Sequence, residues 1–343
     1  VQAAQIRELN AERRSVQKQI GVISRTDAHG ALTELGLLPN YSLIDVSTTL
    51  EATLTWQDED KDGKKLYLSE LREYSRSARQ ALFELAPGNH FYIQGYHHRI
   101  SGLDIGRPSR PLLEQWRICS DCGYVREQLA SQDTSPCPRC HSTQLGDASA
   151  LHKVLRPSRP TSYDRRDDAR ISDDSDDRDR QFYERVFTVD VDPEHIEPGS
   201  WRHAKRTFGV DFTRRAVVRT LNLGIRRPDL QPTDRLAGQD TRIGKFFTCV
   251  SCGGTATDKP TGPGQADPLV SSGYNQPSHH RLWCPQRRGT GPGDHAELIL
   301  AHVLPTEAIR VLLPVATALV NERVASFAAA LMAGVAKKYG GDP

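Results

Sequence analysis

Four cysteines in two close pairs constrain this chain more than any other feature of its sequence. Cys119 and Cys122 form one Cys-x-x-Cys pair, and Cys137 and Cys140 form a second pair after 14 intervening residues. Each such turn brings two thiolates to one side of the backbone, at the separation that a tetrahedral zinc ion requires. Gly123 and the proline inside the second pair suit these tight turns. Two pairs on facing hairpins predict a zinc ribbon.

A second set of soft donors lies nearer the C-terminus. Cys249 and Cys252 form a third Cys-x-x-Cys pair, and Cys284 follows 32 positions later. The chain has seven cysteines, so the fourth donor of this set must be another residue type. His280 precedes Cys284 by four positions, a spacing that lets both side chains reach one ion, and His279 is the alternative. The sequence therefore predicts a second zinc site formed by Cys249, Cys252, His280 and Cys284.

Other roles for these cysteines remain open at this point. Cys284 as a free thiol beside exposed histidines is the alternative for the second set, and His141 is an alternative ligand to Cys140. Redox exchange needs a single Cys-x-x-Cys at the start of a helix, and a catalytic zinc keeps only three protein ligands. The spacing favours two closed, structural sites.

Length and composition bound the class of protein. The chain has 343 residues, room for about two domains. Its 45 Lys and Arg nearly balance 43 Asp and Glu, so a net charge of +2 does not by itself indicate a nucleic-acid binder. Neither an 18-residue apolar run nor a basic-then-apolar N-terminus is present, which predicts no membrane partner and no secretory signal. Cysteines spaced for metal predict a reducing compartment, the cytoplasm.

The ends of the sequence suggest a piece of a longer protein. Residue 1 is valine, and the last residues, GGDP, directly follow a helical pattern. We expect a segment whose parent holds an active site elsewhere.

The pattern of apolar residues predicts an α+β fold with β-rich subdomains, an inserted zinc ribbon, a second zinc site and flanking helices. Residues 1–25 follow a three-four repeat typical of a helix, and 43–56 alternate as in a strand. Residues 69–88 predict one helix closed by Pro-Gly, and 90–106 a hairpin with Gly95 near its turn.

Nearer the C-terminus, residues 296–304 fit either a buried strand or a helix. A helix is clearer from residue 316 on, because seven apolar residues share one face. These are Leu319, Val320, Val324, Phe327, Leu331, Met332 and Val335.

These patterns divide the chain into five predicted parts. They are a helical connector (1–40), a β-rich module (41–110 with 147–235), the zinc ribbon (111–146), the second zinc site (236–290) and the start of a C-terminal α/β module (291–343), which we expect to be truncated. Within the β-rich module, residues 156–180 carry mixed charges and almost no apolar side chains, which predicts an exposed loop.

A basic strip lies between residues 202 and 227, where Asp211 is the single acid and Trp201, Phe208 and Phe212 are interleaved. Such a strip can follow a phosphate backbone while aromatic rings stack on bases. A solvated strand face, or pairing with the acidic segment 173–179, explains it equally well. The positions predicted to contact nucleic acid are Arg202, Lys205, Arg206, Arg214, Arg215 and Arg219.

Several stretches together resemble a known family. They are ALTELGLLPNYSL, SRSARQALFELAPGNHFYIQG, WRICSDCGY, HHRLWCP, HAELILAHVLPTEAIRVLLP and SFAAALMAGVAKKYGGDP. In this order they resemble the C-terminal zinc-binding region of large bacterial DEAD/DEAH-box (superfamily-two) helicases of the mitomycin-repair and anti-phage-defence type. The resemblance covers most of the chain, best at 30–140 and 245–343.

The resemblance implies a parent that is an ATP-dependent DNA helicase or translocase acting in DNA repair or phage defence. In that family the motor precedes this region, in keeping with the lack of a complete nucleotide-binding or catalytic motif in the sequence. The implied partners are DNA, the helicase motor domains and subunits of a defence complex. The sequence thus predicts an accessory zinc-binding, DNA-contacting module. The alternatives are a protein-interaction platform and, ranked lower, a free-standing zinc hydrolase or nuclease.

Overall fold

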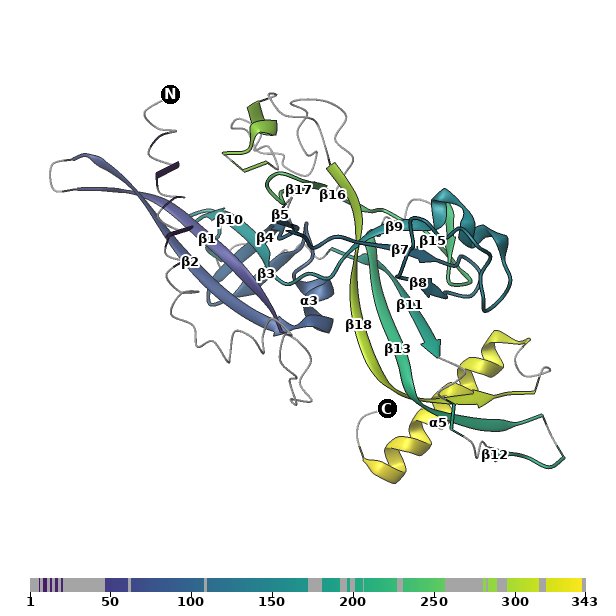
Figure 1. Cartoon of the computed structure of the whole chain (residues 1–343). Helices are drawn as coiled ribbons and strands as arrows, with labels where there is room; N and C mark the ends of the chain where they lie inside the picture. The colour runs from purple at the N-terminus through teal and green to yellow at the C-terminus, as the bar shows by residue number, and fades with distance from the viewer. Residues whose placement is uncertain are drawn as a thin grey trace. The chain divides into compact units, whose positions relative to one another are not determined.

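The computed structural model describes most of the chain from residue 47 onwards. Besides helical positions between Ile6 and Ile20, the described ranges are 47–60, 63–107, 110–171, 181–191, 196–197, 201–205, 207–226, 231–256, 280–281, 283–288, 295–314 and 319–340. The fold is α+β and rich in strands, as the sequence predicts (Figure 1). None of the helices in these ranges combines the length and the apolar character needed to span a bilayer.

A five-stranded sheet occupies the first half of the chain. Its order is β2 (Lys65–Ser77), β1 (Ser47–Glu59), β10 (Pro160–Arg165), β4 (Tyr96–Leu103) and β3 (His90–Ile93). Residues Leu50, Ala52 and Leu54 of β1 are buried and alternate with half-exposed residues, and the first two belong to a core that the short helix α3 (Ala78–Glu84) completes. The β3–β4 hairpin turns at Gln94 and Gly95, both with positive φ, where the sequence predicts a turn.

The prediction of one helix over residues 69–88 is wrong for its first half. Residues Lys65–Ser77 form β2 instead and pair with β1 along the whole strand. Tyr74 lies opposite Leu50 and is buried. Helix propensity is a weak preference, and pairing with a neighbouring strand overrides it. The helix begins only after Ser77, whose Oγ accepts a hydrogen bond from the N–H of Gln80.

The prediction of an exposed loop over residues 156–180 is also wrong in part. Strand β10 lies inside that stretch and occupies the centre of the five-stranded sheet, parallel to β1 and antiparallel to β4. Thr161 and Ser162 are buried although neither is apolar. A central strand satisfies its backbone groups on both sides, so small hydroxyl side chains suffice there. Residues 172–180 of this stretch, which include the acidic segment 173–179, lie outside the described residues.

A nine-stranded sheet contains strands from the predicted ribbon, the β-rich module, the second zinc site and the C-terminal part. Residues 296–304, whose sequence fits either a buried strand or a helix, belong to its strand β18. Its main path runs β11 (Tyr183–Val191), β13 (Gly209–Ile225), β18 (His295–Leu312), β9 (Leu151–Leu155), β7 (Glu114–Ile118) and β8 (Val125–Arg126). Attached to this path are β12 (Trp201–Arg202), β16 (Phe246–Cys249) and β17 (Thr255–Ala256).

Short elements complete the described fold. Two small hairpins pair β5 (Gly106–Arg107) with β6 (Arg110–Pro111) and β14 (Asp234–Leu236) with β15 (Gln239–Thr241). Three short 3₁₀ helices are η1 (Thr143–Gly146), η2 (Ala148–Ala150) and η4 (Pro285–Arg288). The last described element is helix α5 (Asn321–Tyr339), in the region where the sequence predicts a helix.

The chain divides into two compact units. The larger unit comprises residues 1–188 and 219–302, and the smaller unit residues 189–218 and 303–343. Both predicted zinc sites belong to the larger unit. Within the smaller unit, the ring of Phe208 packs edge to face on Phe327 of α5 and on Trp201. Leu331, Met332 and Val335 on the same helix are exposed.

A buried histidine makes the stability of the larger unit depend on pH. His152 lies opposite Trp116 in the β7–β9 pair, and no described residue hydrogen-bonds its Nδ1. Burial lowers the pKa of His152 to about 4. In the unfolded chain this histidine has a pKa of about 6.5. Between pH 6.5 and 4 it is therefore protonated in the unfolded chain but neutral in the folded chain.

Acidification is thus expected to destabilise the fold through His152, by about 2 kcal/mol at pH 5 relative to pH 7. A His152→Leu variant lacks this contribution, so its loss of stability between these two pH values is smaller by that amount. Denaturant unfolding of both proteins at both pH values measures the difference, because other acid effects are shared. Equal losses in the two proteins would contradict the assignment.

Candidate metal centres

All three Cys-x-x-Cys turns have the same backbone geometry. The N–H of the first cysteine donates to the carbonyl five residues later, and the N–H after the second cysteine donates back to the first cysteine's carbonyl, all at 2.8–3.1 Å. The residue after the second cysteine has positive φ in each turn, 72° at Gly123, 59° at His141 and 71° at Gly253. Glycine adopts this conformation without steric cost, which explains two of the three positions.

The first cluster brings together the four cysteines that the spacing selects. Its ligand atoms all lie within 4.8 Å of one another. The Sγ atoms of Cys119 and Cys140 are 3.6 Å apart, and those of Cys122 and Cys137 are 3.5 Å apart. His141 occupies the left-handed turn position, and Cys140 supplies the donor, as the spacing favours. All seven cysteines are free thiols.

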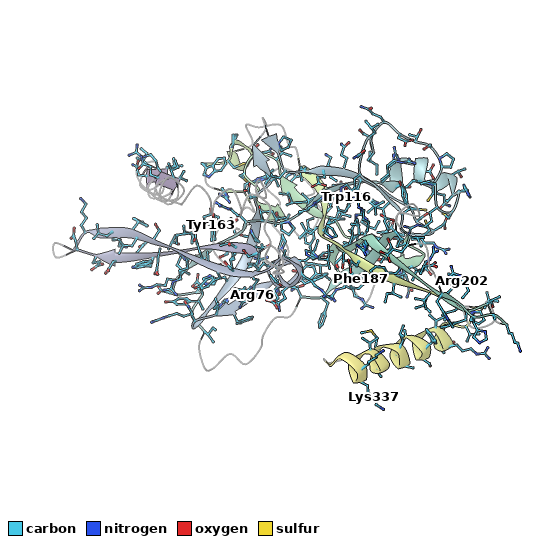
Figure 2. The ribbon with its side chains drawn as sticks, turned by 60° about the horizontal axis from the view of Figure 1, so that its bottom comes forward. Arg76, Trp116, Tyr163, Phe187, Arg202 and Lys337 are labelled. Carbon is cyan, nitrogen blue, oxygen red and sulfur yellow. The ribbon has the colours of Figure 1, made fainter. Side chains whose placement is uncertain are left out.

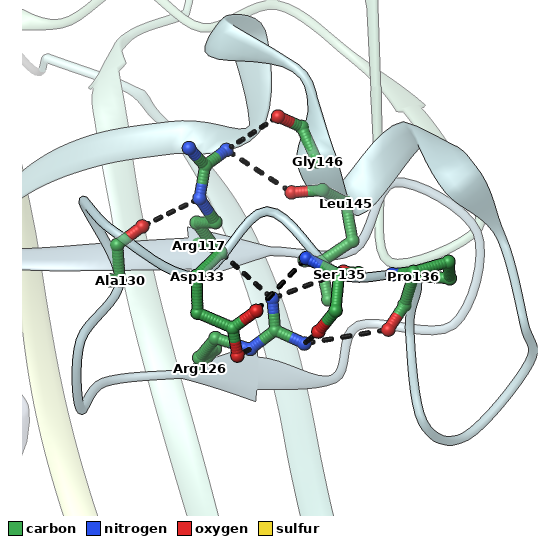
Figure 3. A network of polar contacts seen from close by, with 8 residues as sticks. All are labelled: Arg117, Arg126, Ala130, Asp133, Ser135, Pro136, Leu145 and Gly146. Carbon is green, nitrogen blue, oxygen red and sulfur yellow. Dashed lines mark hydrogen bonds and ion pairs between the residues drawn. The ribbon is translucent and has the colours of Figure 1, made fainter.

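Two buried arginines hold the loops of this ribbon in place (Figure 3). Arg117 donates from Nε to the carbonyl of Ala130 at 2.6 Å and from Nη1 to the carbonyls of Leu145, Gly146 and Asp147 at 3.2, 3.1 and 2.6 Å. Backbone carbonyls in loops have no ladder partner, so a guanidinium with five donors is suited to gather them.

Arg126 performs the same role for the loop before Cys137 (Figure 3). It donates to the carbonyls of Asp133 and Ser135 at 3.0 and 3.1 Å, and its Nε lies 3.0 Å from the carboxylate of Asp133. The sequence pattern alone predicts no structural role for either arginine. The sequence does contain a signal for them: Arg117 lies two residues before Cys119 and Arg126 lies four residues after Cys122, each next to apolar residues.

The second cluster combines Cys249, Cys252, Cys284 and His280, again with all ligand atoms within 4.8 Å of one another. The Sγ atoms of Cys249 and Cys284 are 3.8 Å apart, and the Nδ1 of His280 lies 3.9 Å from Cys252 Sγ and 3.7 Å from Cys284 Sγ. His280 thus faces the thiols through Nδ1. His279, the alternative ligand, lies outside the described residues.

The turn of the second cluster is bound to the five-stranded sheet. The N–H of Leu103 in β4 donates to the carbonyl of Gly253 at 2.9 Å, and Gly102 and Gly254 form an isolated β-bridge. A Cβ on Gly253 would lie 2.1 Å from the carbonyl oxygen of Leu103, so only glycine fits this close approach. The second cluster therefore cross-links the two sheets of the larger unit.

The thiols of each cluster share their protons unequally. Burial raises the pKa of Cys119 and of Cys122, whereas a backbone N–H lowers the pKa of Cys140. In the second cluster, a hydrogen bond from Cys252 lowers the pKa of Cys249 to about 3, and the same bond raises the pKa of Cys252. Two neighbouring buried thiolates repel each other, so the second thiol of such a pair does not lose its proton readily. A bound cation offsets this repulsion and allows all the thiols of a cluster to be deprotonated.

Of the positions predicted to contact nucleic acid, those in the smaller unit differ in exposure and partners. Lys205, Arg214 and Arg215 are exposed. Arg214 forms an ion pair with Glu197 at 2.6 Å. Arg202, labelled in Figure 2, donates a hydrogen bond to the buried carboxylate of Asp211, which also accepts hydrogen bonds from Arg310. Arg206 and the acidic segment 173–179 lie outside the described residues.

Arg219 does not fit the predicted strip. It lies in the larger unit and is only 5% exposed. Its guanidinium pairs with Glu127 at 2.8 Å and lies 5.7 Å from the ring centre of Trp116. The local burial of β13 explains the difference, because residues 219–224 of this strand are all buried, whereas Arg214 and Arg215 lie on an exposed stretch of it. Arg219 is therefore a core residue of the sheet, and we exclude it from the DNA-contacting set.

Three kinds of comparison bear on what these sites belong to. The chain matches no protein-family model, no curated protein and no solved structure. The chemistry of the two clusters and of the surfaces around them is therefore the basis for assigning a function.

Proposed function

We propose that the chain is an accessory module with two structural zinc sites that contacts DNA, serving an ATP-dependent DNA helicase or translocase. The observation that carries this proposal is the pair of closed clusters, each with four protein donors from this chain. The free thiols suit the reducing cytoplasm.

Zinc fits both donor sets. A tetrahedral ion with Zn–S bonds of about 2.3 Å places neighbouring sulfurs about 3.8 Å apart. The sulfur pairs here are 3.5, 3.6 and 3.8 Å apart. Thiolate-rich tetrahedral sites select zinc or iron, and a set of three cysteines and one histidine is typical of zinc.

Four ligands from the protein complete the coordination of a tetrahedral ion. A catalytic zinc keeps a position for water or substrate, which these sets do not provide. The ions instead supply folding free energy to short strands and long loops that bury little apolar surface. A free-standing zinc hydrolase or nuclease is therefore disfavoured, and the metal-loaded chain alone is not expected to cleave DNA.

The exposed basic residues of the smaller unit support contact with DNA. Lys205, Arg214 and Arg215 are exposed, and the same unit carries Trp201, whose ring is half-exposed and available to stack. The resemblance to helicase C-terminal regions supplies the rest of this proposal. The motor domains are then the principal partner, and this surface guides one strand leaving the motor.

Charge reversal at Arg214→Glu and Arg215→Glu is expected to weaken DNA binding by about tenfold or more at low salt and to flatten its salt dependence. Two phosphate contacts contribute about 1.4 to the slope of log K against log salt for a single strand. Fluorescence anisotropy with a labelled oligonucleotide at several salt concentrations measures both quantities. Unchanged affinity and slope would argue against this surface.

A specific observation favours a second candidate function, a protein-interaction platform within a defence complex. Leu331, Met332 and Val335 of α5 are exposed, and apolar side chains grouped on one helix are typical of a docking face. Unchanged DNA affinity in the double variant just described would favour this second candidate over the first.

A further inference from the structure

One face of the five-stranded sheet carries aromatic and basic side chains instead of a core. The inward face packs on α3 through Leu50, Phe91 and Ile100. Successive side chains of a strand point to opposite sides, so the residues between these face outward. We use the term outer face for six of these residues: Tyr163 and Arg165 of β10, His97 and Arg99 of β4, and His90 and Tyr92 of β3.

The register of the strands places these residues next to one another. His90 is opposite Arg99, and Tyr92 is opposite His97, in the β3–β4 hairpin. The rings of His90 and His97 are 5.6 Å apart, and those of Tyr92 and His97 are 6.0 Å apart. On β10, Tyr163 and Arg165 follow Ser162, which pairs with Ile100 of β4. The outer face therefore forms one continuous patch across three strands.

Tyr163 provides the most accessible ring of this patch. Its side chain is 45% exposed, and Figure 2 labels it on the sheet. The guanidinium of Arg281 lies 4.9 Å from its ring centre, and Arg281 also donates to Thr161 at 3.3 Å. An exposed ring with a guanidinium held against it offers both a stacking surface and a positive charge.

The charge of the outer face is positive. Arg99, Arg165 and Arg281 contribute three positive charges. On the adjoining strands of the same side, Glu51 of β1 is paired with Arg159 at 3.4 Å, and Glu73 of β2 and Glu59 at the end of β1 are further acids. A nucleic acid complements such a surface better than an acidic peptide does, because each of its units carries both a flat ring and a negative charge.

We propose that the outer face binds single-stranded DNA, with a base stacked on Tyr163 and phosphates held by Arg99, Arg165 and Arg281. Every base has a flat π-face, and unpaired bases are free to stack on a sheet, whereas a duplex hides its base faces and is read through its grooves. The inference goes beyond the basic surface of the smaller unit. The outer face includes neither Arg214 nor Arg215, so DNA binding by each of the two surfaces can be tested with its own variants.

The test measures binding of a fluorescent oligonucleotide of about 15 thymidines to the whole metal-loaded chain. Tyr163→Ala is expected to weaken binding about tenfold, whereas Tyr163→Phe keeps the ring and the wild-type affinity. Arg165→Gln is expected to reduce the salt slope by about 0.7. Phe187→Ala is the matched control, because Phe187 is 46% exposed, lies 6.0 Å from the guanidinium of Arg185 and belongs to the other sheet (Figure 2).

A second measurement does not depend on any variant. Short-wavelength irradiation of the complex is expected to cross-link thymine to Tyr163 or Tyr92, identified by peptide mass spectrometry. Equal affinity of the wild type and Tyr163→Ala, or cross-links confined to other regions, would overturn the proposal. Tighter binding of duplex DNA or of oligouridine would also overturn it, since either would assign the face to another nucleic acid. Loss of binding in the Arg214 and Arg215 variant alone bears only on the proposed function.

Discussion

Replacing Cys249 with serine is expected to lower the zinc content of the purified chain from two ions to one, and replacing Cys119 with serine is expected to do the same at the other cluster. Each substitution removes one of four donors from a closed site. The remaining three donors bind zinc more weakly, and the buried thiols then lose the cation that offsets their charge. Elemental analysis of the purified proteins gives the ratio directly.

The same substitutions are expected to lower stability substantially. A site that holds its ion with free metal at about 1,000 times its Kd contributes about 4 kcal/mol to folding, so its loss lowers Tm by about 10 °C in a chain of this size. The two clusters should differ in consequence. Loss of the second ion loosens the turn at Gly253 that joins the two sheets, whereas loss of the first loosens the ribbon.

Ser251→Ala is the matched control, because Ser251 lies between two ligands of the second cluster and is exposed. It should retain both ions and lose less than about 1 kcal/mol. Two ions retained in Cys249→Ser, or fewer than two in the wild type, would contradict the assignment of the second cluster.

Local geometry explains why the metal ligands were predictable. A Cys-x-x-Cys turn is defined within six residues by two backbone hydrogen bonds, so its spacing alone fixes which thiols converge. The spacing between the pairs carries less information. Cys284 lies 32 positions after Cys252, too far for a local turn to determine that the two thiols meet. His280 was predicted as a ligand only because it lies four positions before Cys284.

Strand β10 shows what the sequence could not reveal. Thr161 and Ser162 are buried because β1 and β4 lie on either side of them, and both partners are distant in sequence. Their composition resembles that of an exposed loop. For the same reason Tyr163 and Arg165 attracted no functional interpretation, since a face exists only once the strands are assembled.

Arg219 illustrates the converse error. Counting arginines between residues 202 and 227 assumes that β13 is exposed along its whole length, although residues 219–224 of this strand are all buried. The pairing of Arg219 with Glu127 depends on a residue 92 positions away. Charge density along the chain therefore overstated the basic surface by including a residue of the core.

Arg117→Met leaves the metal ligands intact and is expected to destabilise the metal-loaded chain by about 4 kcal/mol. Methionine preserves the apolar stem, so the loss comes from the guanidinium. Four backbone carbonyls, those of Ala130, of Leu145 and Gly146 at the end of η1, and of Asp147, then lose a charged donor in a buried setting. Unsatisfied buried acceptors cost about 1–3 kcal/mol each, partly recovered when the loops relax or admit water.

Relaxation of these loops should also weaken the first metal site without changing the second. The carbonyls that Arg117 gathers flank the segment holding Cys137 and Cys140, so their release increases the entropy lost when the four thiolates converge. Competition with a chromophoric chelator should therefore show one ion released more easily in Arg117→Met and the other unchanged. Arg117→Lys retains a charge but reaches fewer carbonyls, and its stability should fall between the two.

Arg156→Met supplies the matched control for this prediction. Arg156 is also an arginine beside Trp116, with its guanidinium 5.6 Å from that ring, but its side chain is 47% exposed and bonds to Glu114. An exposed ion pair contributes about 0–1 kcal/mol, so this variant should unfold close to the wild type. If Arg117→Met were as stable as Arg156→Met, and released both ions like the wild type, the loops of the ribbon would be held by the metal alone.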